Sequence, residues 1–183
     1  MQDPDLQPTL SGEHVVLRPV AASDWDEMFA VAADPLIWAV HPVPDRYTEP
    51  VFRDYFDSAL ASGAALAILD RETGRIIGSS RYHGYDAVSG EIEIGWTFLA
   101  RDYWGGAFNR EIKTLMLDHA FGFAETVIFM VGERNFRSQR AMEKIGGVRR
   151  PALLDRVYQD VVVRHVVYEI RKDGERAGLV SPH

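Results

Sequence analysis

A strand-to-helix junction with two adjacent glycines is the part of this sequence best suited to chemistry. Residues 91–121, EIEIGWTFLARDYWGGAFNREIKTLMLDHAF, change from a strand pattern to a helical pattern after Gly105 and Gly106. Glycine has no Cβ to obstruct a ligand, and the unpaired N–H groups at a helix N-terminus attract phosphate. The junction therefore predicts an anion site, although a glycine pair can also simply turn the chain. It matches neither a Walker loop nor a dinucleotide fingerprint.

A second candidate segment is GERNFRSQRAMEKIGGVRR, residues 132–150. Asn135 and Ser138 stand one helical turn apart, so their side chains can face one groove. Positive charge is supplied by Arg137, Arg140 and Lys144. A purely structural role stays open, with Asn135 as the helix cap and Ser138 as an ordinary first-turn residue.

Three side chains are candidate proton acceptors. Glu91 and Glu93 share one face of their predicted strand, and His41 has an imidazole whose ordinary pKa is near 6.5. The alternatives are an ion pair or a solvated strand face for the glutamates and a surface-loop position for His41. The six histidines include no pair three or four residues apart, so no metal site is predicted.

The composition is typical of a globular protein with one domain. The chain has 183 residues, of which 46% are hydrophobic and 26% charged, and it has no cysteine to act as a nucleophile. Its net charge of -7 argues against binding to nucleic acid. The sequence shows neither a signal-peptide pattern nor a run of about 18 apolar residues. We therefore expect a cytoplasmic location and no membrane partner.

Charge is distributed unevenly along the chain. Residues 1–50 hold nine acidic and two basic residues, whereas residues 101–150 hold six acidic and nine basic ones. Unless this is ordinary surface variation, it predicts an anionic ligand near the third quarter and a cationic one near the first.

Hydrophobic periodicity predicts seven strands and four helices in the order β-α-α-β-β-β-α-β-α-β-β. Residues 34–48, which are rich in proline and aromatic side chains, are predicted to be irregular. A single domain is expected over residues 11–172, with tails at 1–10 and 173–183. The predicted strands are 14–20, 64–70, 75–85, 90–100, 126–131 and two within 148–170; the predicted helices are about 23–33, 48–61, 107–123 and 135–146.

Taken together, these segments resemble the GNAT superfamily of acyl-CoA-dependent N-acyltransferases, in particular its Rim-type branch of ribosomal-protein N-terminal acetyltransferases. The resemblance spans about 160 residues: LSGEHVVLRPVAASDWDEMF, EIEIGW, DYWGGAFNREI and RNFRSQRAMEKIGGVRR. It implies an α+β GNAT fold, with a mixed, mostly antiparallel twisted sheet of about seven strands flanked by about four helices. It also implies a cofactor cleft where strands four and five splay apart.

The resemblance implies acetyl-CoA as the co-substrate, with no metal. The pyrophosphate would lie on backbone N–H groups of the glycine junction, and the pantetheine arm would pair with the strand that precedes it. The cofactor residues implied are Phe98, Leu99, Ala100, Trp104, Gly105, Gly106, Ala107, Phe108, Asn109, Arg110, Asn135 and Ser138.

Three positions depart from the family pattern. Ala107 stands where a second loop glycine is usual, and Asn109 stands where an alanine is usual. Many members place a tyrosine seven residues after the asparagine, as general acid for the departing thiolate. Here that position is Met142, which cannot donate a proton, so Ser138 is the implied substitute.

The resemblance and the absence of cysteine predict direct attack of a primary amine on the bound thioester. At pH 7 a lysine amine with a pKa near 10.4 is neutral in about 0.04% of molecules, and an α-amine near 7.7–8.0 in about 10–17%. A protein N-terminal α-amine is therefore the favoured acceptor. A small-molecule amine acetyltransferase of the aminoglycoside or polyamine kind, and a non-catalytic acyl-CoA-binding module, are the alternatives.

The predicted catalytic residues are Ser138 and Glu93. The resemblance places the acceptor pocket in the variable region before the first meander strand, within the acidic first quarter, whose charge would suit a cationic amine. Packing of two helices on the sheet is the alternative role for its aromatic residues. Relatives are often dimers, so a homodimer is compatible with the resemblance. The predicted acceptor-binding residues are Trp38, His41, Tyr47 and Glu93, with Phe52 and Tyr55 nearby.

Overall fold

One continuous sheet positions every other element. In the computed structural model, which describes residues 3–158 and 160–174, eight strands lie in the order β1-β2-β3-β4-β5-β6-β8-β7. All neighbours are antiparallel except β5 and β6, which confirms the predicted α+β class with a mostly antiparallel sheet. The strands are β1 (Leu10–Ser11), β2 (Val15–Pro19), β3 (Ala65–Asp70), β4 (Ile76–Asp86), β5 (Glu91–Leu99), β6 (Thr126–Gly132), β7 (Val148–Tyr158) and β8 (Val161–Arg171).

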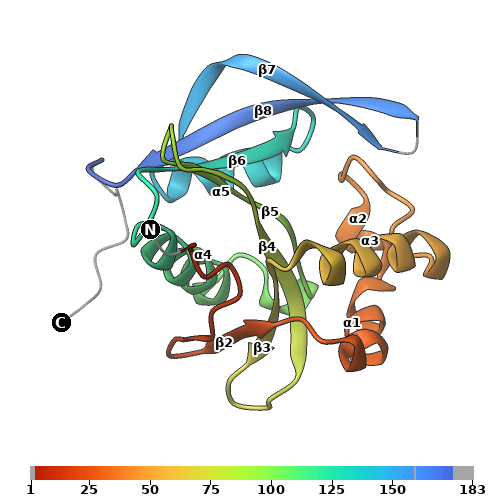
Figure 1. Cartoon of the computed structure of the whole chain (residues 1–183). Helices are drawn as coiled ribbons and strands as arrows, with labels where there is room; N and C mark the ends of the chain where they lie inside the picture. The colour runs from red at the N-terminus through yellow and green to blue at the C-terminus, as the bar shows by residue number, and fades with distance from the viewer. Residues whose placement is uncertain (1–2, 159, 175–183) are drawn as a thin grey trace.

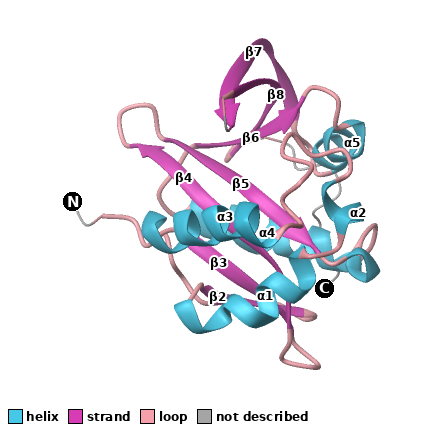
Figure 2. Cartoon of the chain, turned by 90° about the vertical axis from the view of Figure 1, so that its right-hand side faces the viewer, coloured by secondary structure: helices cyan, strands magenta, loops and turns pink. Residues whose placement is uncertain are grey.

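Helices cover both faces of the sheet, as Figure 1 shows and the turned view of Figure 2 repeats. The first three pack on one face, and α4 and α5 pack on the other. None of the helices in the described part of the chain is long and apolar enough to cross a membrane. The helices are α1 (Trp25–Ala32), α2 (Pro35–Trp38), α3 (Glu49–Ser62), α4 (Ala107–Ala120) and α5 (Phe136–Lys144).

Two short elements raise the numbers above those predicted from the sequence. The two-residue β1 pairs with β2, and its first residue, Leu10, belongs to the predicted N-terminal tail. The one-turn α2 lies in the segment predicted to be irregular; Pro35 occupies its first turn, and the Asp34 carboxylate accepts from the Leu36 N–H at 3.0 Å. At the other end, residues 175–183 of the predicted C-terminal tail lie outside the described residues.

Strand β3 is buried on both faces because its side chains alternate between two hydrophobic clusters. Leu66 and Ile68 join the cluster under α4 and α5, while Ala65 and Ala67 join the cluster under α1 and α3. The small alanines leave room for the aromatic side chains of the latter cluster, which include Phe52. Burial on both faces explains why β3 reads as a continuous apolar run.

Helix α4 is tied to β2 by one carboxylate. The side chain of Glu111 accepts hydrogen bonds from the backbone N–H groups of Glu13 at 2.5 Å, His14 at 2.8 Å and Val15 at 2.9 Å. These N–H groups stand at the start of the strand, far from α4 in sequence. The carboxylate therefore fixes the helix that begins at the glycine junction against the sheet.

We expect Glu111→Ala to lower the free energy of unfolding by about 2–4 kcal/mol, because it leaves three backbone donors without their charged acceptor. Urea unfolding followed by circular dichroism measures the change. Glu125→Ala is the matched control, since the Glu125 side chain is 66% exposed and only 3.9 Å from Lys172. Equal effects of the two substitutions would show that the Glu111 contacts do not hold the helix.

Candidate active site

Strands β5 and β6 pair at one end only. Glu91–Glu93 lie opposite Thr126–Ile128 in parallel register, and the pairing stops there. Beyond that point Ile94–Leu99 and Phe129–Gly132 line a cleft of about 670 Å³ between the separated strands. Because β1 adds one strand to the predicted order, β5 and β6 are the predicted strands four and five. The cleft therefore lies where the resemblance to the GNAT superfamily implied it.

An irregularity in β5 shapes the wall of this cleft. Between the pairs Arg81–Gly95 and Ser79–Phe98, β5 advances three residues while β4 advances two. The extra residue makes a β-bulge, and Trp96 there has a φ of 51°, which is rare for a residue with a side chain. The Tyr55 hydroxyl donates to the Trp96 carbonyl at 2.7 Å, so α3 holds the strained turn in place.

The glycine junction forms one end of the cleft. Gly105 has a φ of 70°, which favours glycine, and a Cβ on Gly106 would meet no protein atom within 4 Å. Helix α4 begins at the next residue, so its unpaired first-turn N–H groups border this open space. The geometry is that of an open space at the positive end of a helix dipole, and the anion site there stays a prediction.

Most of the predicted cofactor residues surround the cleft. Three do not reach it. The Ala100 N–H donates to the Ile77 carbonyl at 2.8 Å, Ala107 lies outside the lining, and the ring of Phe108 packs on Tyr103, with ring centroids 4.8 Å apart. The predicted residues that do line the cleft are Phe98, Leu99, Trp104, Gly105, Gly106, Asn109, Arg110, Asn135 and Ser138.

Asn135 and Ser138 enter the cleft from the start of α5. The Asn135 side-chain oxygen accepts from the Ser138 N–H at 3.2 Å, so the predicted cap is confirmed. The side chain of Ser138 is half-buried in the cleft lining, and its hydroxyl has no hydrogen-bond partner among the described residues. Met142, at the position of the family tyrosine, is buried beside it and offers no proton. Ser138 is thus a hydroxyl donor whose proton is available to a ligand.

Of the predicted acceptor-binding residues, Trp38, His41 and Glu93 line the cleft. Burial, followed by the charge of Arg46, lowers the pKa of His41 to about 3, so its ring is neutral at pH 7. Its Nδ1 accepts from the Val43 N–H at 3.0 Å. The predicted contact Tyr47 is 39% exposed and does not line the cleft.

The two other aromatic residues predicted nearby, Phe52 and Tyr55, belong to the hydrophobic core under α3. Their position supports the packing role that the sequence left open. Tyr55 still borders a smaller pocket next to the cleft, which Arg46, Trp96 and Tyr158 share with it.

Both candidate glutamates are engaged in ion pairs. Glu93 is 5% exposed, and its two carboxylate oxygens accept from Arg156 at 3.0 and 2.5 Å. Glu91 pairs with Arg150 at 2.5 Å and does not line the cleft. The ion-pair alternative considered for the glutamates is therefore the arrangement in the structure. Among the described residues there is also no group of three or more histidines and carboxylates that could hold a metal ion.

Besides Arg46, sequence reasoning missed two buried titratable residues of the cleft, Lys113 and His165. Lys113 of α4 is 4% exposed, its ammonium donates to Thr97 at 3.0 Å, and burial lowers its pKa to about 8. Lys113 precedes the buried residues Met116, Leu117 and Ala120 by three, four and seven positions, so it lies on the same apolar face of the helix. This spacing could have indicated its burial. The second residue, His165, stands in a nearly continuous apolar strand, which gave a weaker signal.

His165 is held as a neutral ring with a defined tautomer. It is 2% exposed on β8, and burial is the main cause that lowers its pKa. Its Nδ1 lies 2.9 Å from the Val163 carbonyl, which can only accept, so Nδ1 carries the hydrogen. In the neutral ring Nε2 then holds the lone pair, as a proton acceptor requires.

The cleft is lined by cations. Of its charged lining residues, seven are lysine or arginine and one, Glu93, is acidic. From residues 1–50 the lining takes Ile37, Trp38, His41, Pro42 and Arg46, none of them acidic. The expectation that the acidic first quarter would give a negative acceptor pocket is therefore wrong, because those acids lie elsewhere: Asp24 pairs with Arg18 and Asp34 with Arg101.

Comparison with known proteins agrees with this geometry. Residues 14–148 match the family model described as an acetyltransferase (GNAT) domain. A solved structure from T. thermophilus, provisionally assigned as an acetyltransferase, is 31% identical, with 94% of this chain and 92% of that chain covered and a TM-score of 0.76. The chain therefore belongs to the GNAT family of acetyltransferases, and its fold is the GNAT fold.

More distant structures share the fold alone. A Vibrio cholerae protein provisionally assigned as a ribosomal-protein-serine acetyltransferase is 14% identical, covering 93% of this chain and 99% of that one, with a TM-score of 0.75. The microcin C7 self-immunity acetyltransferase MccE, solved with acetyl-CoA and AMP, is 12% identical. The match covers 91% of this chain and 98% of that one, with a TM-score of 0.72. No curated protein matches the chain.

We expect Lys113→Met to raise the free energy of unfolding by about 2–3 kcal/mol at pH 7. The lowered pKa of Lys113, about 8 against an ordinary 10.5, means that the folded protein holds a disfavoured charge below pH 8. Stability of the parent should therefore rise between pH 8 and 10.5, where the unfolded lysine is protonated and the folded one is not, and the advantage of the variant should shrink.

Urea unfolding at pH 7, 8, 9 and 9.5 measures this difference. Lys172→Met is the control, since the Lys172 side chain is 43% exposed. An advantage of Lys113→Met that stays constant over this pH range would contradict the assignment.

Proposed function

We propose that the protein is an acetyl-CoA-dependent N-acetyltransferase that transfers an acetyl group to a primary amine. One observation carries this proposal: the unpaired edge of β5 runs along a cleft that ends at the open glycine junction of α4. An extended chain with backbone-like amides and a terminal diphosphate fits such a site, because the strand edge offers hydrogen bonds and the helix N-terminus favours phosphate.

The residues present suit acetyl-CoA from end to end. Gly105, Gly106 and the first turn of α4 would hold the pyrophosphate, with Arg110 adding charge. Residues Phe98 and Leu99 would pair with the pantetheine arm, and the cations of α5 would face the remaining phosphate. MccE, which shares the fold, was solved with acetyl-CoA bound, and this supports the assignment for the family.

Bound acetyl-CoA supplies an acetyl thioester, and the acceptor supplies the amine that attacks it. Ser138 is the proposed general acid: its free hydroxyl, at the start of α5, would give a proton to the departing sulfur. The amine must first lose a proton. Glu93 remains a candidate for that step, although both of its carboxylate oxygens already accept hydrogen bonds from Arg156.

His165 is the additional candidate that the structure offers. Its neutral ring lines the cleft, and the hydrogen on Nδ1 leaves the lone pair on Nε2. Glu93 and His165, acting as the base, predict different pH profiles of kcat/KM. Loss of Glu93 would leave a histidine-controlled rise of kcat/KM with pH, whereas loss of His165 would remove that rise.

The acceptor class is a proposal with two candidates. A protein N-terminal α-amine, as in the Rim-type branch, is favoured because an α-amine needs little help to lose its proton at pH 7. A small-molecule amine is the second candidate. It is favoured by the volume of the cleft, about 670 Å³, which leaves room for a small molecule beside the buried Arg46.

Thiol release from acetyl-CoA, measured against a panel of N-terminal peptides, amino acids, polyamines and aminoglycosides, tests the proposal. We expect release with one class of amine and none without acceptor. Binding of acetyl-CoA with no release across the panel would instead support a non-catalytic acyl-CoA-binding module.

We expect Gly106→Val to weaken acetyl-CoA binding at least tenfold while the unliganded protein keeps nearly the same melting temperature. A Cβ at this position meets no protein atom within 4 Å, so the side chain is directed into the space proposed for the pyrophosphate. Isothermal titration calorimetry gives the affinity, and Ala87→Val, in the exposed turn after β4, is the control. Unchanged affinity would show that the pyrophosphate lies elsewhere.

We expect Ser138→Ala to lower kcat by about 10²-fold or more and to change KM for acetyl-CoA little, since a leaving-group acid acts in the transition state. Steady-state thiol release measures both constants. Ser89→Ala removes a hydroxyl from an exposed turn and should match the parent. Equal kcat in the Ser138 variant and the parent would exclude the role.

A further inference from the structure

Arg46 is a buried cation without a counter-ion. It is 7% exposed, and among the described residues it forms no ion pair. Its Nε is buried with no hydrogen-bond partner. Its Nη1 lies 3.5 Å from Nε2 of His41, but that contact is weak, because the Val43 N–H already donates to Nδ1 and leaves the hydrogen of a neutral ring on Nε2.

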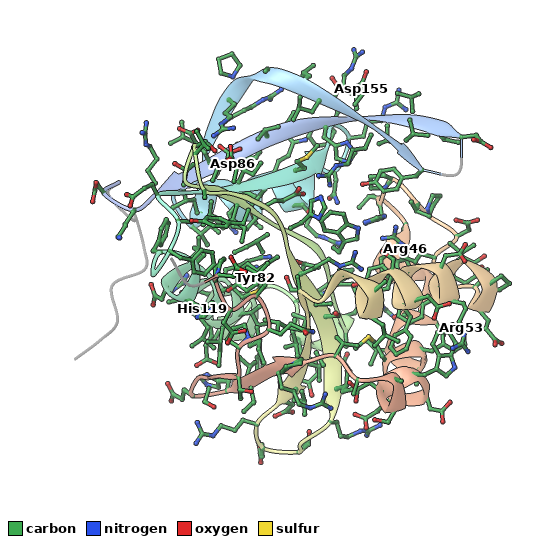
Figure 3. The ribbon with its side chains drawn as sticks, viewed as in Figure 1. Arg46, Arg53, Tyr82, Asp86, His119 and Asp155 are labelled. Atoms are coloured by element: carbon green, nitrogen blue, oxygen red, sulfur yellow. The ribbon has the colours of Figure 1, made fainter. Side chains whose placement is uncertain are left out.

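The guanidinium of Arg46 lies over two aromatic rings. Its central carbon is 5.3 and 5.1 Å from the ring centroids of Trp38 and Tyr55. In Figure 3 it lies above α3, toward the end of the β7–β8 hairpin. The side chain lines both the main cleft and the smaller pocket of about 180 Å³ beside it. A buried guanidinium that lines open space and has an unpartnered Nε is suited to bind a ligand.

A second buried arginine strengthens the positive field. Arg81 is 4% exposed, its Nε also lacks a partner, and its guanidinium lies 5.7 Å from the Tyr55 ring on which Arg46 stacks. Its one short hydrogen bond goes to the neutral Ser58 hydroxyl at 3.0 Å. Asp54 also borders the small pocket, but it is exposed and pairs with neither arginine among the described residues.

Burying a charge without a partner is costly, and the cost falls when an opposite charge arrives. A carboxylate or a phosphate matches the planar fork of an arginine through two parallel hydrogen bonds. The proposed acetyl-CoA phosphates lie by the glycine junction at the start of α4, whereas Arg46 lies beside Trp38 and Tyr55. The anion that Arg46 would bind therefore belongs to the second substrate.

We propose that the acceptor is an amine that carries its own anionic group, a carboxylate or a phosphate, and that Arg46 binds this group next to the reaction site. The inference rests on the proposed function and names the substrate class within it. Cationic polyamines and aminoglycosides, which have no such group, are then poor acceptors.

Paired acceptors that differ only in the anion test this inference. The panel contains L-amino acids with their amides, and phosphoethanolamine with ethanolamine, so that the carboxylate and phosphate arms are separate. We expect kcat/KM to be at least tenfold higher for the anionic member of each productive pair. A preference, in both arms, for the members that lack the anionic group would overturn the proposal.

Arg46→Gln should lower kcat/KM for the acceptors with an anionic group by about 10- to 100-fold, mainly through KM. For amines without that group, kcat/KM should stay within twofold of the parent value. Arg46→Met keeps an apolar side chain against the two aromatic rings and should give the same result. Agreement of the two variants would exclude a folding defect as the cause. Arg53→Gln is the control: Arg53 has a 42% exposed side chain and lies on the other side of α3 (Figure 3). Equal losses for anionic and neutral acceptors would contradict the assignment.

A binding measurement separates this inference from the proposed function. With coenzyme A saturating the phosphate sites, N-acetylglycine should raise the melting temperature of the parent by several degrees, and N-acetylglycinamide should not. The shift should vanish in Arg46→Gln and persist in Arg53→Gln. This result would stand even if no acceptor were acetylated, whereas equal shifts for the two compounds, or none, would reject the anion site.

Discussion

The separation of β5 from β6 is the constraint on which the rest of the site depends. Parallel pairing lasts for three residue pairs and then ends, so the sheet itself opens the cleft. The bulge at Trp96 turns β5 away at that point, and the Tyr55 hydroxyl secures its carbonyl. Exposed backbone edges normally find hydrogen-bond partners, so the open edge in the centre of this sheet is the basis of the proposed acetyl-CoA site.

The buried polar groups of the cleft follow from this opening. Lys113 reaches the cleft from α4, where its ammonium donates to the Thr97 hydroxyl, itself hydrogen-bonded to Ser80 at 2.8 Å, and faces the Phe129 ring. Arg46 and His165 also line the cleft, and among its described lining residues Glu93 is the one carboxylate. A cationic interior suits an anionic co-substrate. It also disfavours the protonated form of an amine bound there, which is the form that cannot attack.

The sequence predicted the features that depend on local patterns. The glycine junction, the α4 face, the Asn135 cap and the β3–β4–β5 meander are set by residues close together in the chain, and the structure contains all of them. Arg46 was missed because its environment comes from Trp38 and Tyr55, which local periodicity cannot bring together. The acidic count of the first quarter misled for the same reason: ion pairs with distant arginines, as between Asp34 and Arg101, remove those carboxylates from the cleft.

Hydrogen exchange with and without acetyl-CoA tests the central claim most directly, because it reports on the backbone edge itself. We predict protection of residues 94–100 of β5 and of 105–110 at the start of α4, with little change in the β3–β4 turn. Protection confined to other segments, or none at saturating acetyl-CoA, would contradict the claim that the parted strands form the acetyl-CoA site.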